Sequence, residues 1–216
     1  MKRLLSLLVI YTIYYLLLGC AVRMPKEKGH FKTTDLVELI KIDPTLKLDI
    51  RYATKNNLAG RAVYTQPRAF LQRDAALAVA AVNRELKPLG YGLLIFDGYR
   101  PWSVTKLFWD VTKPKDRQFV ANPKNGSRHN RGCAVDLSLY DLKTGKEVEM
   151  TGAYDEMSER SYPEYTGGTT RQRHLRDLLR SKMEAHGFTV FKVEWWHFDY
   201  KDWKMYRISD VPFERL

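Results

Sequence analysis

Strand-like and helix-like stretches alternate irregularly along this chain, and their order constrains its fold more than any other feature. Short apolar runs that predict strands cover residues 36–40, 46–50, 92–96, 134–139 and 188–193. Patterns that predict helices cover residues 73–86, 102–109 and 170–186. The sequence contains no internal repeat and no sign of a second domain. We therefore predict an α+β fold in a single domain, with a central antiparallel sheet flanked by helices.

Turn-forming residues mark the connections between these elements. Thr144-Gly145 predicts the turn of a hairpin over residues 142–150, and Gly187 stands where a glycine ends the last helix. Residues 113–125 are polar and predict a mobile loop. Residues 154–168 are rich in Gly, Pro, Ser and acidic side chains and predict an irregular connection.

The composition is that of an ordered protein with a basic surface. With 216 residues, 44% apolar and 28% charged, the chain suits one domain with its own hydrophobic core. Its formal net charge of +11 fits nucleic acid, an anionic membrane or acidic wall polymers as partners. The densest cationic stretch, residues 171–180, interleaves Arg with Leu and predicts a solvated helix face, so the excess is scattered. No aromatic-basic patch is visible, so nucleic-acid binding is not expected.

The first residues carry the features of an export signal. Lys2 and Arg3 precede an apolar stretch over residues 4–18, which leads into the sequence Leu-Leu-Gly-Cys ending at Cys20. This order resembles the lipobox of bacterial lipoproteins, in which the cysteine is acylated and becomes the first residue. Two alternatives stay open. Residues 4–22 are an uncharged run of nineteen, about enough for an uncleaved transmembrane anchor, and a plain cleaved signal is the third reading.

All three readings place the folded part outside the cytoplasm. We expect a membrane-anchored lipoprotein of the periplasm or cell envelope, at the outer membrane if the cell has two, since no Asp follows the cysteine. The expected organisation is a signal peptide over residues 1–20, a polar tether over 21–33 and a folded domain over 34–216. After Cys20 one cysteine remains, Cys133, so no internal disulfide is expected.

A histidine and an aspartate seven residues apart form the first candidate site. His129 precedes Gly132, which allows a sharp turn, and Asp136 begins an apolar strand. Such a turn can bring the imidazole and the carboxylate together, and zinc accepts nitrogen and oxygen ligands of this kind. A hydrogen-bonded pair without a metal is the alternative interpretation.

The second candidate is the sequence Glu-Trp-Trp-His over residues 194–197. A regular strand would point Glu194 and His197 to opposite faces, whereas a bend or helical turn would let both reach one cavity. His197 would then be a third metal ligand, and Glu194 a general base acting on metal-bound water. An aromatic core segment with one polar pair is the alternative.

The third candidate is Arg100, held between the turn at Asp97-Gly98 and the helix that follows Pro101. A guanidinium fixed in this way can stabilise the oxyanion that forms when water attacks a peptide carbonyl. A surface salt bridge is the common alternative for such a residue.

Together these segments resemble the VanX-type D-alanyl-D-alanine dipeptidases, relatives of the zinc D,D-carboxypeptidases, from about Leu36 to Tyr200. The motifs that carry the resemblance are residues 97–101, 127–136 and 194–197, supported by 49–54, 57–64 and 157–161. The resemblance implies the zinc D,D-peptidase (hedgehog-like) fold and one zinc ion per chain. It implies that His129, Asp136 and His197 hold the zinc, with Glu194 as base and Arg100 as transition-state stabiliser.

The resemblance also implies how substrate is bound. Tyr52 and Ser127 would help to line the site, and Asp155 would receive the free amino terminus. Cys133 stands where relatives often carry a small residue, and we expect it to be packed. The lipobox departs from cytoplasmic members, so clearance of cytosolic dipeptide before wall synthesis is not the expected role.

The expected function is hydrolysis of free D-alanyl-D-alanine to two D-alanines at the cell envelope. One alternative is a D,D-carboxypeptidase that trims peptidoglycan stem peptides, which needs an open groove for the long acyl side of its substrate. Asp155 discriminates between the two, because a carboxylate that pairs with a free ammonium favours dipeptides. Another is a non-catalytic zinc-binding envelope lipoprotein, for which Arg100 and Glu194 would be unnecessary.

Overall fold

A computed structural model of the chain describes residues 22–216. The predicted signal segment, with Cys20, lies outside the described residues. Among the residues described, no helix combines the length and the apolar character needed to cross a membrane.

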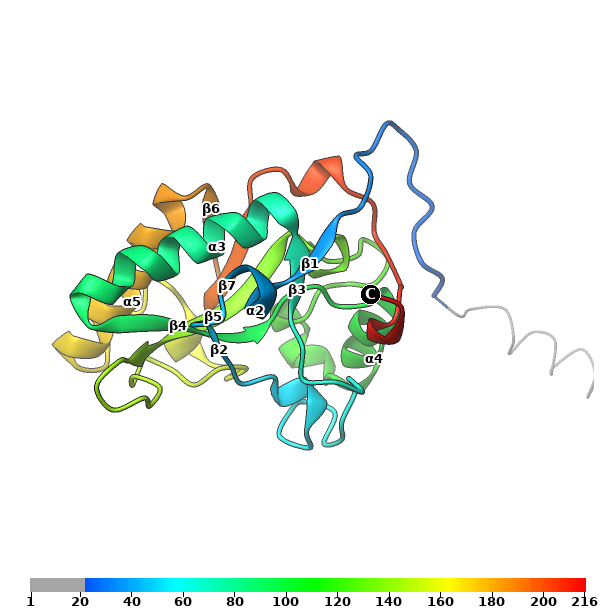
Figure 1. The fold of residues 1–216 in the computed structure, drawn as a ribbon. Helices are drawn as coiled ribbons and strands as arrows, with labels where there is room; N and C mark the ends of the chain where they lie inside the picture. Colours follow the sequence, from blue (N-terminus) through cyan, green and yellow to red (C-terminus); the bar gives the residue numbers. More distant parts are fainter. Residues whose placement is uncertain (1–21) are drawn as a thin grey trace, which may run out of the picture.

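The described chain forms a mixed α+β domain (Figure 1). Its strands are β1 (Leu36–Glu38), β2 (Lys47–Leu48), β3 (Phe70–Gln72), β4 (Tyr91–Asp97), β5 (Ala134–Asp141), β6 (Phe188–Phe191) and β7 (Glu194–Tyr200). Its α-helices are α2 (Leu39–Ile42), α3 (Arg73–Leu86), α4 (Trp102–Val111) and α5 (Thr170–Ala185). Short 3-10 helices are η1 (Arg51–Ala53), η2 (Lys87–Leu89), η3 (Pro114–Phe119), η4 (His129–Arg131), η5 (Glu159–Ser161), η6 (Trp203–Met205) and η7 (Phe213–Arg215).

The central sheet has five strands in the order β2-β4-β5-β7-β6, and β1 and β3 form a separate pair. All neighbours in the central sheet are antiparallel except β2, which runs parallel to β4 at the edge. The prediction of a central antiparallel sheet flanked by helices is therefore confirmed, with one short parallel edge strand added.

Two long helices cover one face of this sheet. Helix α3 packs on β4, α5 packs on β6, and the two helices contact each other (Figure 1). Glu85 of α3 accepts from Lys182 at 3.0 Å and pairs with His186 at 2.9 Å, next to the end of α5. The chain leaves α5 through Gly187 at φ 84°, as the glycine position predicted.

Three predicted elements differ in the structure. Residues 39–42 form helix α2, so the predicted strand ends at Glu38. The predicted hairpin over 142–150 is reduced to one bridge, between Tyr140 and Glu147. The predicted loop over 113–125 contains η3, which begins at a proline. Each difference lies where a short apolar or polar run fits more than one local structure.

The face of the sheet away from α3 and α5 carries the polar groups. In β5, Val135 and Leu137 are fully buried core residues, whereas Asp136 between them points to the opposite face. Cys133, just before β5, is also fully buried, as predicted, and burial raises the pKa of its thiol to about 12. The N-terminal end of β5, the middle of β7 and the short helix η4 meet at this face.

Candidate active site

The three predicted ligands come together because of strand register and one tight turn. Asp136 on β5 stands directly opposite His197 on β7 in the antiparallel pairing. His129 lies in η4, and Gly132 ends that turn at φ 65°, which returns the chain into β5. A side chain at Gly132 would place its Cβ 2.3 Å from Leu36, so this close turn requires glycine.

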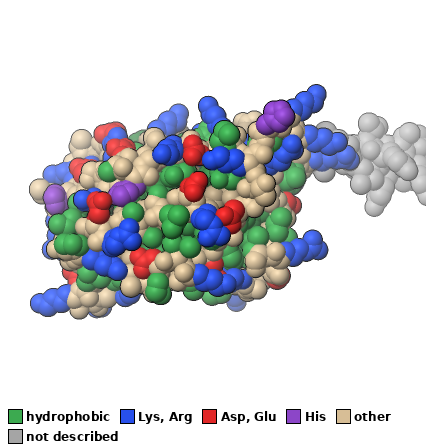
Figure 2. Space-filling view, turned by 45° about the horizontal axis from the view of Figure 1, so that its top comes forward, with side chains coloured by type: hydrophobic (Ala, Val, Ile, Leu, Met, Phe, Trp, Pro, Cys, Tyr) green, Lys and Arg blue, Asp and Glu red, His purple; other side chains and the backbone are tan. Residues whose placement is uncertain are grey.

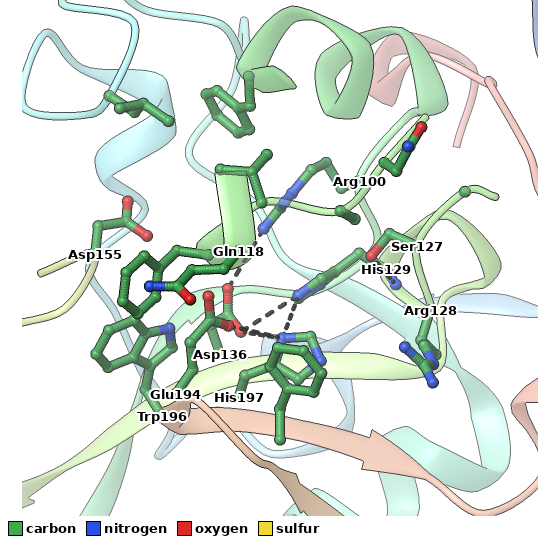
Figure 3. A pocket seen from close by; sticks show the side chains of 18 of the residues that line it. Arg100, Gln118, Ser127, Arg128, His129, Asp136, Asp155, Glu194, Trp196 and His197 are labelled. Carbon is green, nitrogen blue, oxygen red and sulfur yellow. Dashed lines mark hydrogen bonds and ion pairs between the residues drawn. The ribbon is translucent and has the colours of Figure 1, made fainter. Parts of the chain in front are cut away.

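The ligand atoms converge on one point (Figure 3). Asp136 Oδ1 lies 3.0 Å from His197 Nδ1 and 3.3 Å from His129 Nε2, and the two imidazole nitrogens are 3.1 Å apart. Asp136 Oδ1 is buried and accepts no well-aligned hydrogen bond. A buried carboxylate oxygen facing two imidazole nitrogens is the donor set of a zinc site with three protein ligands, so the residues fit a metal ion. Their role as ligands stays a prediction.

The hydrogen bonds of the other two ring nitrogens fix each imidazole in the tautomer that metal binding requires. His129 Nδ1 lies 2.6 Å from the carbonyl oxygen of Gly98, which can only accept, so Nδ1 carries the hydrogen. His197 Nε2 likewise donates to Asp199 Oδ1 at 3.0 Å. In its neutral, metal-binding form each ring therefore turns a lone pair toward the point that Asp136 Oδ1 faces, at His129 Nε2 and His197 Nδ1.

An irregular register brings Glu194 to the same cavity as His197. In the β6–β7 pair, Val190 is opposite Phe198, but its neighbour Phe191 is opposite Glu194, so β7 carries extra residues at this point. Such an irregularity changes the direction of side chains relative to a regular strand. Glu194 Oε2 lies 3.7 Å from His197 Nδ1. The bend that sequence reasoning required is present.

The Glu194 carboxyl is poised to hold a proton. Burial raises its pKa, the nearby charges of Asp136 and Asp155 add to this, and His197 and Arg100 oppose it, giving a pKa of about 8. A carboxyl with a pKa raised toward neutrality is suited to general acid-base chemistry.

Arg100 is buried between two carboxylates. Its Nε donates to Asp97 Oδ2 at 2.8 Å, and its Nη2 lies 3.4 Å from Asp136 Oδ2. The guanidinium also stacks on the rings of Tyr52 and Phe108, at 5.2 and 5.3 Å from their centres. Arg100 is thus fixed in the cavity wall, and the surface salt bridge that sequence reasoning left open is excluded.

The predicted substrate residues line the same cavity, of about 230 Å³. Tyr52 donates its hydroxyl hydrogen to Asp155 Oδ1 at 3.1 Å. Asp155 lies across the cavity from His129 (Figure 3). Burial raises the pKa of Asp155 to about 7, and the charge of Asp136 adds to the rise. Ser127 Oγ accepts from the backbone nitrogen of His129 at 3.2 Å. The structure brings together all eight predicted residues that fall within its described part.

Sequence reasoning missed several residues of the site. Asp97 orients Arg100, Tyr154 donates to Asp136 Oδ2 at 3.1 Å, and Gln118 of η3 reaches into the cavity (Figure 3). Asp199 also went unnoticed, although a carboxylate two residues after a histidine in a strand shares its face and is a recognisable signal. Gln118 lies in a segment predicted as a mobile loop, where no local pattern marks it.

Comparison with known proteins identifies the family of the chain. Residues 32–212 match the peptidase M15 family, described as D-Ala-D-Ala dipeptidase. A D-alanyl-D-alanine dipeptidase of Escherichia coli strain K12 is 36% identical over 77% of this chain and 85% of its own length. One from Enterococcus faecalis strain V583 is 35% identical over 78% of this chain and 88% of its own.

Among solved structures, the LdcB LD-carboxypeptidase aligns with 80% of this chain and 71% of its own at a TM-score of 0.45 and 20% identity. Nothing further depends on that likeness. The family match spans nearly the whole described domain, including every site residue discussed above. The chain therefore belongs to the peptidase M15 family of D-Ala-D-Ala dipeptidases.

Proposed function

We propose that this chain is a zinc-dependent dipeptidase that hydrolyses free D-alanyl-D-alanine into two D-alanines. The observation that carries the proposal is one small cavity with His129, Asp136 and His197 on one side and Asp155 on the other. A cavity of about 230 Å³ suits a dipeptide better than a long stem peptide. The names of the relatives support the same substrate.

A zinc ion held by the three ligands would supply a water of lowered pKa and a positive charge beside the scissile carbonyl. Glu194, 3.7 Å from a ligand nitrogen, accepts the proton as water adds to the carbonyl carbon. Glu194 then delivers that proton to the nitrogen as the C–N bond breaks. Arg100 stabilises the negative charge that develops on the carbonyl oxygen, and Asp97 holds it in place for this purpose.

Asp155 is the residue that favours a free dipeptide over a blocked peptide. Asp155 is half-buried in the cavity wall, and its carboxyl accepts a hydrogen bond from Tyr52. Its backbone is in the left-handed region at φ 62°. A carboxyl in a cavity wall with no ion pair among the described residues favours pairing with an ammonium group, and no such pairing is available to an N-acylated substrate.

Asp155→Asn is expected to lower kcat/KM for free D-alanyl-D-alanine about 10- to 100-fold, the worth of a charge-assisted hydrogen bond. The poor turnover of N-acetyl-D-alanyl-D-alanine should not fall further, because that substrate makes no ion pair. Both substrates are assayed with zinc-loaded protein. The matched control is Tyr52→Phe, which keeps the ring and the Asp155 charge and should cost less. Equal cleavage of both substrates by the unaltered protein would support the D,D-carboxypeptidase instead.

We also propose that the protein is a lipoprotein held at a membrane of the cell envelope, through Cys20. Support comes from two segments that contact each other where the described chain begins. The backbone nitrogen of Lys32 donates to the Met205 carbonyl at 2.8 Å, and Arg207 stacks on Phe31 at 4.5 Å.

Residues 23–32 and 201–207 contribute exposed cations to this region, which we name the basic end (Figure 2). They are Arg23, Lys26, Lys28, Lys32, Lys201, Lys204 and Arg207. The acids there are engaged: Glu27 binds Arg131 at 2.6 Å, and Asp202 lies 4.0 Å from Lys32. Each cation near an anionic membrane adds about 1 kcal/mol of attraction, which complements a lipid anchor.

Cys20→Ser is expected to move the protein from the membrane fraction to the soluble fraction once salt screens the basic end. The measurement is fractionation of cells that produce the full-length chain, at low and high ionic strength. Cys133→Ser serves as the matched control, because that thiol is buried in the domain. Retention of Cys20→Ser on membranes at high salt would favour an uncleaved anchor.

A further inference from the structure

A carboxylate outside the predicted ligand set contacts one of the ligands directly. Asp199 follows His197 by two residues on β7, so both side chains stand on the same face of the strand. Asp199 Oδ1 accepts the hydrogen of His197 Nε2 at 3.0 Å. Ala134 is the residue opposite Asp199 on β5, and its small side chain leaves room for this contact.

The second oxygen of Asp199 reaches the loop that carries another ligand. Asp199 Oδ2 lies 3.4 Å from Arg128 Nε, and Arg128 directly precedes His129. The Arg128 guanidinium stacks on the Trp203 ring at 4.7 Å, which restricts its motion. Figure 3 shows Arg128 leaving the same loop as Ser127 and His129. Asp199 therefore contacts the ligand His197 of its own strand with one oxygen and pairs with Arg128 of that loop through the other.

This arrangement has a specific consequence for a bound metal. An imidazole binds a metal through one nitrogen, and an acceptor on the other nitrogen fixes the tautomer, the ring orientation and the electron density. For His129 the acceptor is the carbonyl of Gly98 at 2.6 Å, and the carboxylate of Asp97 lies farther away, 3.6 Å from the same nitrogen. His197 is the ligand ring with a charged acceptor, and the Asp199 side chain is only 14% exposed, so solvent weakens the contact little.

We propose that Asp199 and Arg128 are positioning residues for the metal. Asp199 holds His197 with Nδ1 directed at the ion, and Arg128 holds Asp199 and keeps the two ligand-bearing segments at a fixed separation. This inference rests on the proposed zinc chemistry. Arg128 is among the residues that line the substrate cavity, whereas Asp199 is not.

The test measures zinc affinity by competition with a chelator, without using turnover. Asp199→Ala is expected to weaken zinc binding about 10- to 100-fold, the usual cost of losing such a partner. Asp199→Asn keeps a neutral acceptor for His197 Nε2, and its zinc affinity should lie between those of Asp199→Ala and the unaltered protein. Arg128→Gln should weaken binding less than Asp199→Ala. The double variant Arg128→Gln/Asp199→Ala should bind zinc little more weakly than Asp199→Ala alone, because Arg128 acts through Asp199.

Asp202→Ala is the matched control, since this nearby carboxylate is 39% exposed and lies 4.0 Å from its partner Lys32. It should bind zinc like the unaltered protein. The visible spectrum of the cobalt-loaded protein should change for Asp199→Ala and not for Asp202→Ala, because the geometry at His197 is altered.

Three results would overturn the inference. They are zinc binding by Asp199→Ala as tight as in the unaltered protein, equal weakening of zinc binding in Asp202→Ala, and an unchanged cobalt spectrum in Asp199→Ala. Failure of the unaltered protein to bind zinc would instead contradict the proposed function, so the two failures are distinguishable.

Discussion

Glu194→Gln is expected to lower kcat for D-alanyl-D-alanine about 100- to 10,000-fold, the range that a positioned acid-base group contributes. Glutamine has nearly the shape of glutamate but cannot take a proton from water or return one to the leaving amine. The carboxyl lies 3.7 Å from His197 and is enclosed by the cavity, so bulk water cannot easily replace it. The measurement is steady-state turnover at a measured zinc content per chain.

The fold should tolerate this substitution. Burial and the charge of Asp136 raise the pKa of Glu194 to about 8, so its ionised form is disfavoured in the metal-free protein. A neutral amide removes this unfavourable ionisation, so the unfolding temperature of the metal-free protein should not fall. Glu194→Asp serves as the control, because it keeps the acid but withdraws it by one methylene, and it should retain intermediate activity. Turnover of Glu194→Gln within tenfold of the unaltered protein, at full zinc occupancy, would remove its role as base.

Arg100→Ala is expected to have the second-largest effect of these substitutions, and to lower both turnover and the free energy of unfolding. Loss of charge stabilisation at the carbonyl oxygen should lower kcat about 100- to 1000-fold, or about 3–4 kcal/mol. The substitution also leaves Asp97 and Asp136 buried without their shared cation. Breaking a buried pair in this way costs about 3–5 kcal/mol of unfolding free energy. Zinc-loaded protein is used for turnover, and denaturant unfolding is measured on metal-free protein.

Two variants separate the charge of Arg100 from its geometry. Arg100→Lys keeps the charge but cannot reach Asp97 and Asp136 with the planar fork of a guanidinium, so it should recover only part of both losses. Arg73→Ala removes an arginine that pairs with Asp35 on the surface, and it should change neither turnover nor unfolding appreciably. Stability and turnover of Arg100→Ala both equal to those of Arg73→Ala would contradict the assignment.

Local sequence was sufficient for the long elements and for the chemistry of the candidate site. The helices over 73–86 and 170–186 follow from periodicity, and their observed ends lie within one residue of the predicted ones. The histidines, carboxylates and arginine of the motifs were identified by residue type and by resemblance. Short elements were less predictable, as at residues 39–42, because a few apolar residues fit either a strand or a helix turn until packing selects one.

Other features depend on contacts between distant segments. The basic end joins residues 23–32 with 201–207, so cations that are far apart in the sequence lie in contacting segments. The pairing of Arg128 with Asp199 is of the same kind, since a local pattern cannot indicate a partner 71 residues away, from 128 to 199.

The sequence by itself determined which side chains can bind a metal, move a proton and stabilise an oxyanion, because those capacities belong to single residues. Only the tertiary structure decided that they act at one point. His129 and His197 are 68 residues apart, and they meet through the register of β5 with β7 and the turn at Gly132. The extra residues in β7 turn Glu194 into the same cavity. Register and packing are set by the burial of the whole core, and no short stretch of sequence carries that information.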